Sequence, residues 1–183
     1  MSEELLVRHC APTLAGLKSG SLFTCPYETV EEMREGIRTA NRWLVPKGLR
    51  AVPLRYGGKR ALIYLYRPKK LEKELQNETA VTLLKNAGYE MRSCNDCVIR
   101  LIEKVRNEPD FPHEIGLFLG YPPEDVWGFI HHNACGHKCV GCWKVYGDEE
   151  AARKTFAKYK KCTRVYCSQW ASGRPIQRLT VAG

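Results

Sequence analysis

Residues 50–67 have the sequence RAVPLRYGGKRALIYLYR, which is typical of a β-hairpin. We expect strands over residues 50–55 and 60–67, joined by Gly57-Gly58, because adjacent glycines supply the positive φ angles of a tight turn. The second strand is apolar at both sets of alternating positions, which predicts that it is buried on both sides. Pro53 has no N–H to donate to a sheet, so the first strand is expected at an edge.

Helical patterns surround the hairpin. Thr29 and Glu32 have the spacing of a capping box, and the apolar residues that follow at intervals of three and four predict a helix up to Leu44. Further elements are expected as helices over residues 12–18, 68–76, 78–87, 93–106, from 122 and from 148, and as strands over 114–120 and 140–146. This irregular order predicts an α+β fold, with one domain over residues 1–183 and a small mixed or antiparallel sheet of about four strands packed by helices.

Composition bounds the class of protein. The chain has 183 residues, of which 44% are hydrophobic and 27% charged, and this balance argues for a globular protein rather than a disordered one. Its longest apolar run is far shorter than the ~20 residues of a membrane span. The acidic N-terminus shows no secretory signal, so we expect a cytoplasmic protein with no membrane partner. In such a reducing compartment we expect the nine cysteines to be free thiols or metal ligands rather than disulfides.

The net charge of +9 suggests an acidic partner such as nucleic acid. The predicted hairpin combines cations with an aromatic ring, as single-strand binders do, at Arg55, Tyr56, Lys59, Arg60 and Arg67. A solvated basic surface explains the same charge. Tyr64 and Tyr66 are expected in the core, because their strand is apolar on both faces.

The segment CGHKCVGC at residues 135–142 offers four metal ligands: Cys135, His137, Cys139 and Cys142. Thiolates and imidazole suit zinc or an iron–sulfur cluster. In an extended chain Cys135 and Cys139 would lie ~13 Å apart, so the segment must curl before one ion can bind. The alternative is a loop of reduced thiols. A fourth or more distant ligand would come from Cys94, Cys97, His131 or His132, although both cysteines of the C-x2-C pair fall on the apolar face of a predicted helix.

A second set of residues suggests a cysteine-dependent enzyme. Cys10 precedes the predicted helix start at Pro12, where a helix dipole would stabilise its thiolate. His113 could act as the base, oriented by Glu114. A structural interpretation, with Cys10 buried and the histidine bonded to loop backbone, fits the sequence equally well.

Several longer blocks resemble one bacterial family. They are HCAPTLAGLK at 9–18, SLF at 21–23, FPHEIGLFLGYP at 111–122 with Asp125-Val126, and WKVYGD at 143–148. The chain is similar here to the domain-of-unknown-function family numbered 3793. The resemblance implies a small cytoplasmic protein without an established activity, associated with iron-responsive loci. Cys135, Cys139 and Cys142 depart from the family pattern.

Three hypotheses about function follow. The first is a protein that binds metal through histidine and cysteine, with a role in iron or metal homeostasis. The second is an enzyme using Cys10 and His113, and the third is a basic nucleic-acid-binding module.

Overall fold

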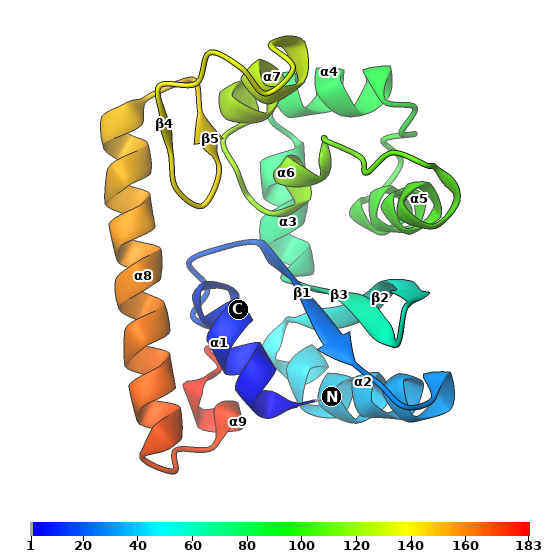
Figure 1. The fold of residues 1–183 in the computed structure, drawn as a ribbon, viewed down its shortest axis with the longest axis vertical. Helices are drawn as coiled ribbons and strands as arrows, with labels where there is room; N and C mark the ends of the chain where they lie inside the picture. The colour runs from blue at the N-terminus through cyan, green and yellow to red at the C-terminus, as the bar shows by residue number, and fades with distance from the viewer. Residues whose placement is uncertain (1) are drawn as a thin grey trace.

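The structure is a computed structural model that describes residues 2–183, and its fold is α+β as predicted (Figure 1). A three-stranded antiparallel sheet and a separate two-stranded one are packed by helices. The elements in chain order are α1 Glu3–Leu14, β1 Gly20–Pro26, α2 Val30–Leu44, a 3-10 turn Val45–Lys47, β2 Arg50–Gly57, β3 Arg60–Tyr66, α3 Pro68–Leu75, α4 Glu78–Asn86, α5 Cys94–Asn107, α6 Ile115–Phe118, α7 Pro123–His131, β4 Cys139–Val140, β5 Lys144–Val145, α8 Glu149–Ala171 and α9 Ile176–Leu179.

The main sheet has the order β1-β3-β2, so β3 is central and buried as predicted. β2 lies at an edge, which leaves room for Pro53, and a register shift follows this proline. The tight turn lies one residue later than expected. Gly58 and Lys59 both have positive φ, at 55° and 57°, as a two-residue hairpin turn of this type requires.

The alternation of side chains along β3 divides the core into two layers. Ile63 and Leu65 pack against α1, α2 and α9 on one face of the sheet. Tyr64 and Tyr66 stack on each other at 4.8 Å and pack toward α3 and α5 on the other face. Figure 1 shows α3 to α7 gathered on this second side.

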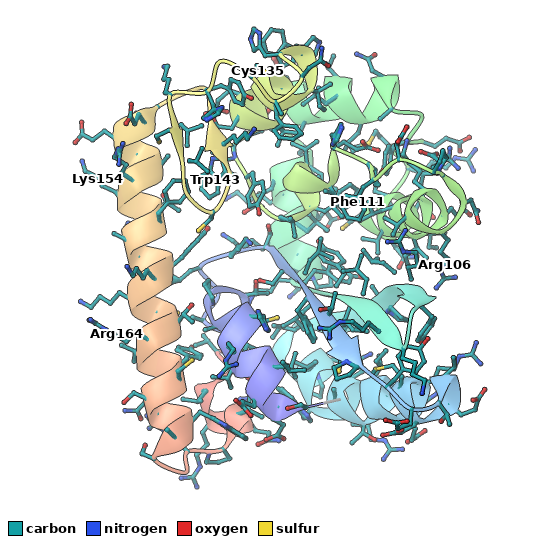
Figure 2. All side chains as sticks on the ribbon, in the orientation of Figure 1. Arg106, Phe111, Cys135, Trp143, Lys154 and Arg164 are labelled. Atoms are coloured by element: carbon teal, nitrogen blue, oxygen red, sulfur yellow. The ribbon has the colours of Figure 1, made fainter. Side chains whose placement is uncertain are left out.

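The helix signals in the sequence act as predicted. Thr29 caps α2 by accepting a hydrogen bond from the Glu32 N–H at 3.1 Å, and the buried face runs from Met33 to Leu44. Asp148 caps α8 by accepting from the Ala151 N–H. The outer face of α8 is solvent-exposed, and Lys154 and Arg164 point away from the molecule in Figure 2.

Three local predictions are wrong. The helix expected over 12–18 spans Glu3–Leu14, and strand β1 follows it. The strand expected over 114–120 is the short helix α6, because an apolar run buried on all sides suits a helical turn as well as a strand. The strand expected over 140–146 is two short strands interrupted by a turn at 141–143.

A buried arginine ties distant segments to the sheet. Arg67 donates hydrogen bonds to the carbonyls of Thr13 and Leu14, at 2.7 and 2.8 Å, and to Val181 O at 2.7 Å. Two of these carbonyls belong to the last turn of α1, where no intrahelical partner is available. Within residues 2–183 no helix is both long and apolar enough to cross a membrane.

Candidate functional site

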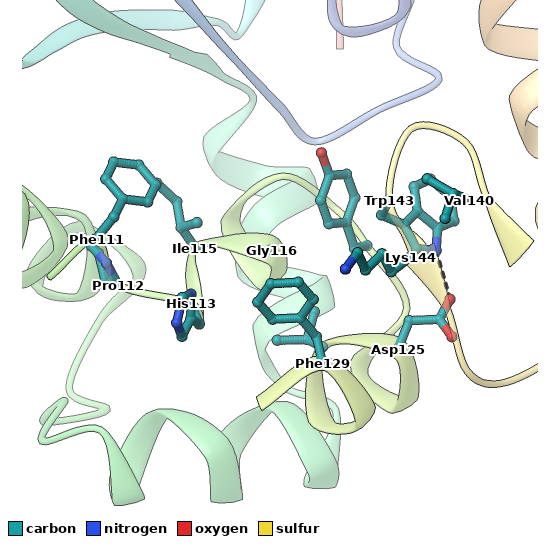
Figure 3. Close-up of a pocket in the computed structure, with 12 residues that line it drawn as sticks. Phe111, Pro112, His113, Ile115, Gly116, Asp125, Phe129, Val140, Trp143 and Lys144 are labelled. Atoms are coloured by element: carbon teal, nitrogen blue, oxygen red, sulfur yellow. Dashed lines mark hydrogen bonds between the residues drawn. The ribbon is translucent and has the colours of Figure 1, made fainter. Parts of the chain in front are cut away.

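A cavity of about 320 Å³ lies between α6, α7 and the β4–β5 hairpin (Figure 3). Its walls are mostly aromatic and aliphatic, with a histidine, an aspartate and a lysine among them. The lining residues are Phe111, Pro112, His113, Ile115, Gly116, Tyr121, Asp125, Val126, Phe129, Val140, Trp143 and Lys144.

The aromatic rings that line the cavity pack against one another and against α8. Tyr121 stacks on Trp143 with 4.9 Å between ring centroids, and Trp143 meets Phe156 of α8 edge-on at 4.5 Å. Gly116 lets α6 approach α7 closely, because a Cβ there would lie 2.8 Å from a methyl group of Val126. The cavity is therefore bounded by fixed rings.

Asp125 joins the hairpin to α7. Its buried carboxylate accepts a hydrogen bond from Trp143 Nε1 at 2.6 Å. It also accepts from the backbone N–H groups of Tyr146 and Gly147, both at 2.7 Å. The negative charge lies in the first turn of α7, where the helix dipole favours it. Because three donors occupy its oxygens, this carboxylate positions the wall of the cavity.

Lys144 brings a positive charge to the cavity. Its ammonium donates to Ala134 O at 2.8 Å and lies 5.9 Å from the centroid of the Phe129 ring. His113 approaches the same ring edge-on at 5.2 Å and is exposed to solvent. In Figure 3 Lys144 and His113 lie on opposite sides of Phe129. An apolar space with a cation at its border suits an apolar ligand that carries an anionic group.

The cavity is built from the blocks that carry the family resemblance. Every lining residue except Phe129 and Val140 comes from residues 111–122, 125–126 or 143–148. Residues 6–180 match the family described as "Protein of unknown function (DUF3793)". The chain belongs to this family. No curated protein and no solved structure matches the chain.

In this DUF3793 protein, the residues of the cysteine-enzyme hypothesis lie apart. Cys10 is fully buried against the α1 face of the sheet, whereas His113 borders the cavity beside α6. Cys10 stands nearer the end of α1 than its start, and burial raises the pKa of its thiol, so both effects disfavour the thiolate. Glu114 pairs with Lys104 at 3.2 Å and accepts from the Tyr89 hydroxyl at 3.1 Å rather than orienting the histidine.

The four residues proposed as metal ligands are not gathered into one site. Cys135 and Cys142 are exposed, and Cys139 and His137 are partly buried. Cys139 lies in the two-residue strand β4 and pairs with Val145 across the hairpin. Across residues 2–183 no three histidine, cysteine or acidic side chains are arranged to hold a metal ion. The donor types fit zinc or an iron–sulfur cluster, but their placement does not.

The more distant ligand candidates have other contacts. Cys97 is buried on α5 with its sulfur 3.7 Å from that of Met91, and Cys94 packs partly against the same cluster. His131 stacks on Trp127 at 4.1 Å and its Nδ1 lies 2.9 Å from the Trp127 carbonyl oxygen. His132 stacks on Tyr146 at 5.7 Å.

The basic hairpin divides into structural and exposed residues. Arg67 is buried and donates hydrogen bonds to three backbone carbonyls. Arg60 donates to Thr24 Oγ1 at 2.8 Å. Tyr56 is partly buried edge-on to Tyr27. Arg55, Lys59 and Arg60 are exposed. Tyr64 and Tyr66 are core residues, as expected.

Apart from His113, sequence reasoning missed the residues that line the cavity. Phe129 and Lys144 belong to no catalytic or metal-binding motif. The sequence around Asp125 does not indicate that this aspartate is buried. The available signal was the resemblance itself, because its blocks contain Asp125, Trp143 and Lys144 without indicating that these residues surround one cavity.

Proposed function

We propose that this protein binds a small, flat, apolar molecule that carries one negative charge. The observation that supports the proposal is the Lys144 ammonium at the border of an aromatic cavity. A volume of about 320 Å³ lies toward the lower end of small-molecule sites, so we expect a ligand of one or two rings.

The rings favour a flat ligand. Tyr121, Phe129 and Trp143 offer aromatic faces and edges, and offset or edge-on contacts between rings stabilise such pairs beyond their buried area. Phe111 and Val140 are 42% and 61% exposed, so they lie where the cavity meets solvent. A ligand that covers them would remove exposed apolar surface from water, which adds to its affinity.

The charge favours an anion. Lys144 uses one of its three N–H groups on Ala134 O, which leaves two that can donate to a carboxylate. Three hydrogen bonds direct the Asp125 carboxylate at Trp143 Nε1 and at the backbone N–H groups of Tyr146 and Gly147 and not at the Lys144 ammonium. His113 offers a further donor at the other side of Phe129.

Calorimetric titration with 2-naphthoate, and with neutral 2-naphthylmethanol for comparison, tests the proposal. We expect naphthoate to bind with one-to-one stoichiometry and at least about tenfold more tightly than the alcohol, which corresponds to ~1.4 kcal/mol from the charge. Lys144→Met should abolish this preference, because it keeps an apolar chain of similar length without the ammonium.

A second pair of variants separates the cavity from general surface binding. Val140→Trp should block the cavity, whereas Val181→Trp places the same ring at another exposed valine outside it. Equal naphthoate affinity in these two variants, or an unchanged preference in Lys144→Met, would contradict the proposal. Circular dichroism of each variant confirms folding.

The metal-binding hypothesis competes with this proposal. It rests on the composition of residues 135–142, whereas the apolar-anion proposal rests on a formed cavity and a positioned cation. We therefore favour the cavity as the functional site.

A further inference from the structure

Helix α8 carries a large share of the positive charge of the protein. It holds six basic and two acidic side chains, so it contributes +4 of the net +9. The six cations are Arg153, Lys154, Lys158, Lys160, Lys161 and Arg164. All six are exposed in the structure.

These cations share one face of the helix. At ~100° per residue they fall within an arc of about 160°, and from Arg153 to Arg164 they extend over roughly 16 Å. The opposite face packs on the protein through Ala152, Phe156 and Tyr166. Figure 2 shows Lys154 and Arg164 pointing outward from the same edge of the molecule. We call the six cations the α8 ridge.

Most of the ridge has no acidic partner. Glu149 pairs with Arg153 and Glu150 with Lys154, both at 2.6 Å in the first turns of the helix. The other four cations make no ion pair with any residue in 2–183. Four like charges within seven residues repel one another, so an anionic partner would relieve a cost that the isolated protein bears.

We propose that the α8 ridge binds the phosphate backbone of double-stranded nucleic acid. A duplex carries one negative charge per ~1.7 Å of its axis, and a rigid row of cations releases the counterions condensed on it. The aromatic residues of α8 face the protein, so the ridge offers no platform on which the bases of a single strand would stack. Insertion into a lipid surface would need a stripe of apolar side chains on the outward face of α8. The apolar stripe of α8 packs on the protein instead.

The contact differs from the one expected from the sequence. In the basic hairpin Arg67 is buried, whereas all six cations of α8 are exposed to solvent. Lysine and arginine side chains that contact phosphates bind the backbone of the nucleic acid. Without contacts to base edges, they do not distinguish one base sequence from another. This inference is independent of the ligand proposed for the cavity.

Fluorescence anisotropy with a labelled 20-base-pair DNA duplex of arbitrary sequence tests the ridge. Affinity measured between 25 and 200 mM salt should fall steeply for the natural protein. The triple variant Lys158→Gln, Lys161→Gln, Arg164→Gln should bind more than tenfold more weakly at the lowest salt. The slope of log affinity against log salt should decrease in magnitude by about 2 to 3, because three phosphate contacts are lost.

The matched control removes the same charge elsewhere. Arg34→Gln, Lys73→Gln and Lys85→Gln replace exposed cations on α2, α3 and α4 that also make no ion pair with the described residues. This control should stay within about twofold of the natural protein. Equal weakening in both triple variants would overturn the ridge, as would no duplex binding at 25 mM salt. Binding to phosphatidylserine vesicles or to the single strand that exceeds duplex binding would also overturn it.

Discussion

Around β3, backbone groups are paired by neighbouring strands, whereas around the cavity several backbone groups are paired by polar side chains. β3 forms antiparallel ladders with both β1 and β2. Between α7 and α8, the carboxylate of Asp125 accepts two backbone N–H groups, and Lys144 and Lys138 donate to backbone carbonyls. A segment that forms little regular structure depends on a few polar side chains, and this arrangement also leaves space between its rings for a ligand.

Removing the carboxylate of Asp125 from the cavity region should cause the largest loss of stability. In Asp125→Ala, Trp143 Nε1 and two backbone N–H groups lose a charged acceptor, so we expect a loss of about 3 kcal/mol or more in the free energy of unfolding. Asp148→Ala removes only an exposed helix cap and should cost about 1 kcal/mol. Urea unfolding measures both, and similar losses would contradict the central role of Asp125.

Alkaline pH should weaken the sheet region through Cys10. Burial raises the pKa of this thiol above its ordinary value near 9, so the folded protein keeps a proton that the unfolded chain releases. Stability from this group is therefore complete below pH 9 and declines above it, by about 1.4 kcal/mol at pH 10. Urea unfolding at pH 8 and 10 should show this loss in the natural protein and in the exposed-site control Cys135→Ala, with a smaller loss in Cys10→Ala. An equal loss in all three would refute the assignment.

Backbone strain should be similar in the two regions. Lys59 in the β2–β3 turn and Ala134 after α7 both adopt positive φ, at 57° and 63°. Glycine tolerates this conformation without the Cβ clash, so Lys59→Gly and Ala134→Gly should each raise the melting temperature, with a gain of about 0.5 to 1 kcal/mol. Destabilisation by Ala134→Gly alone would mean that the loop needs the Ala134 methyl group for packing.

Metal should have the smallest effect on either region. The four candidate ligands in residues 135–142 are not gathered, so equimolar Zn²⁺ should leave the melting temperature of the reduced protein unchanged. Metal analysis after anaerobic purification provides the second measurement. Stoichiometric zinc, or visible absorption from an iron–sulfur cluster, would restore the metal hypothesis and require the hairpin to rearrange.

The sheet region was more predictable from sequence than the cavity. Periodic apolar residues at Met33, Ile37 and Leu44 and the two apolar faces of β3 report burial directly, because helices and strands repeat regularly. β1 was missed because its residues include few of the alternating signals that identify a strand. The cavity depends on contacts between residues 18 to 22 positions apart, such as Asp125 with Trp143 and Gly147, and no local period encodes them.

The candidate site shows the same limit. The residue types suggest chemistry that side-chain placement does not support, since Cys10 is buried between α1 and the sheet and His113 borders the cavity beside α6. Lys144 gives no local signal, and its importance follows from Phe129, fifteen residues before it. A sequence shows which residues could act in catalysis or bind a ligand. Three-dimensional packing determines which of them face the same cavity.

Arg67 has a consequence for how the protein is made. It bonds to Val181, 114 positions further along the chain, as well as to the end of α1. At ~5 to 20 residues per second, a ribosome needs on the order of 6 to 23 s to make that intervening segment. During this interval the guanidinium lacks one of its three acceptors, and the apolar side chains that α9 covers remain in water. We expect the nascent chain to depend on protection by the ribosome or a chaperone until α9 emerges.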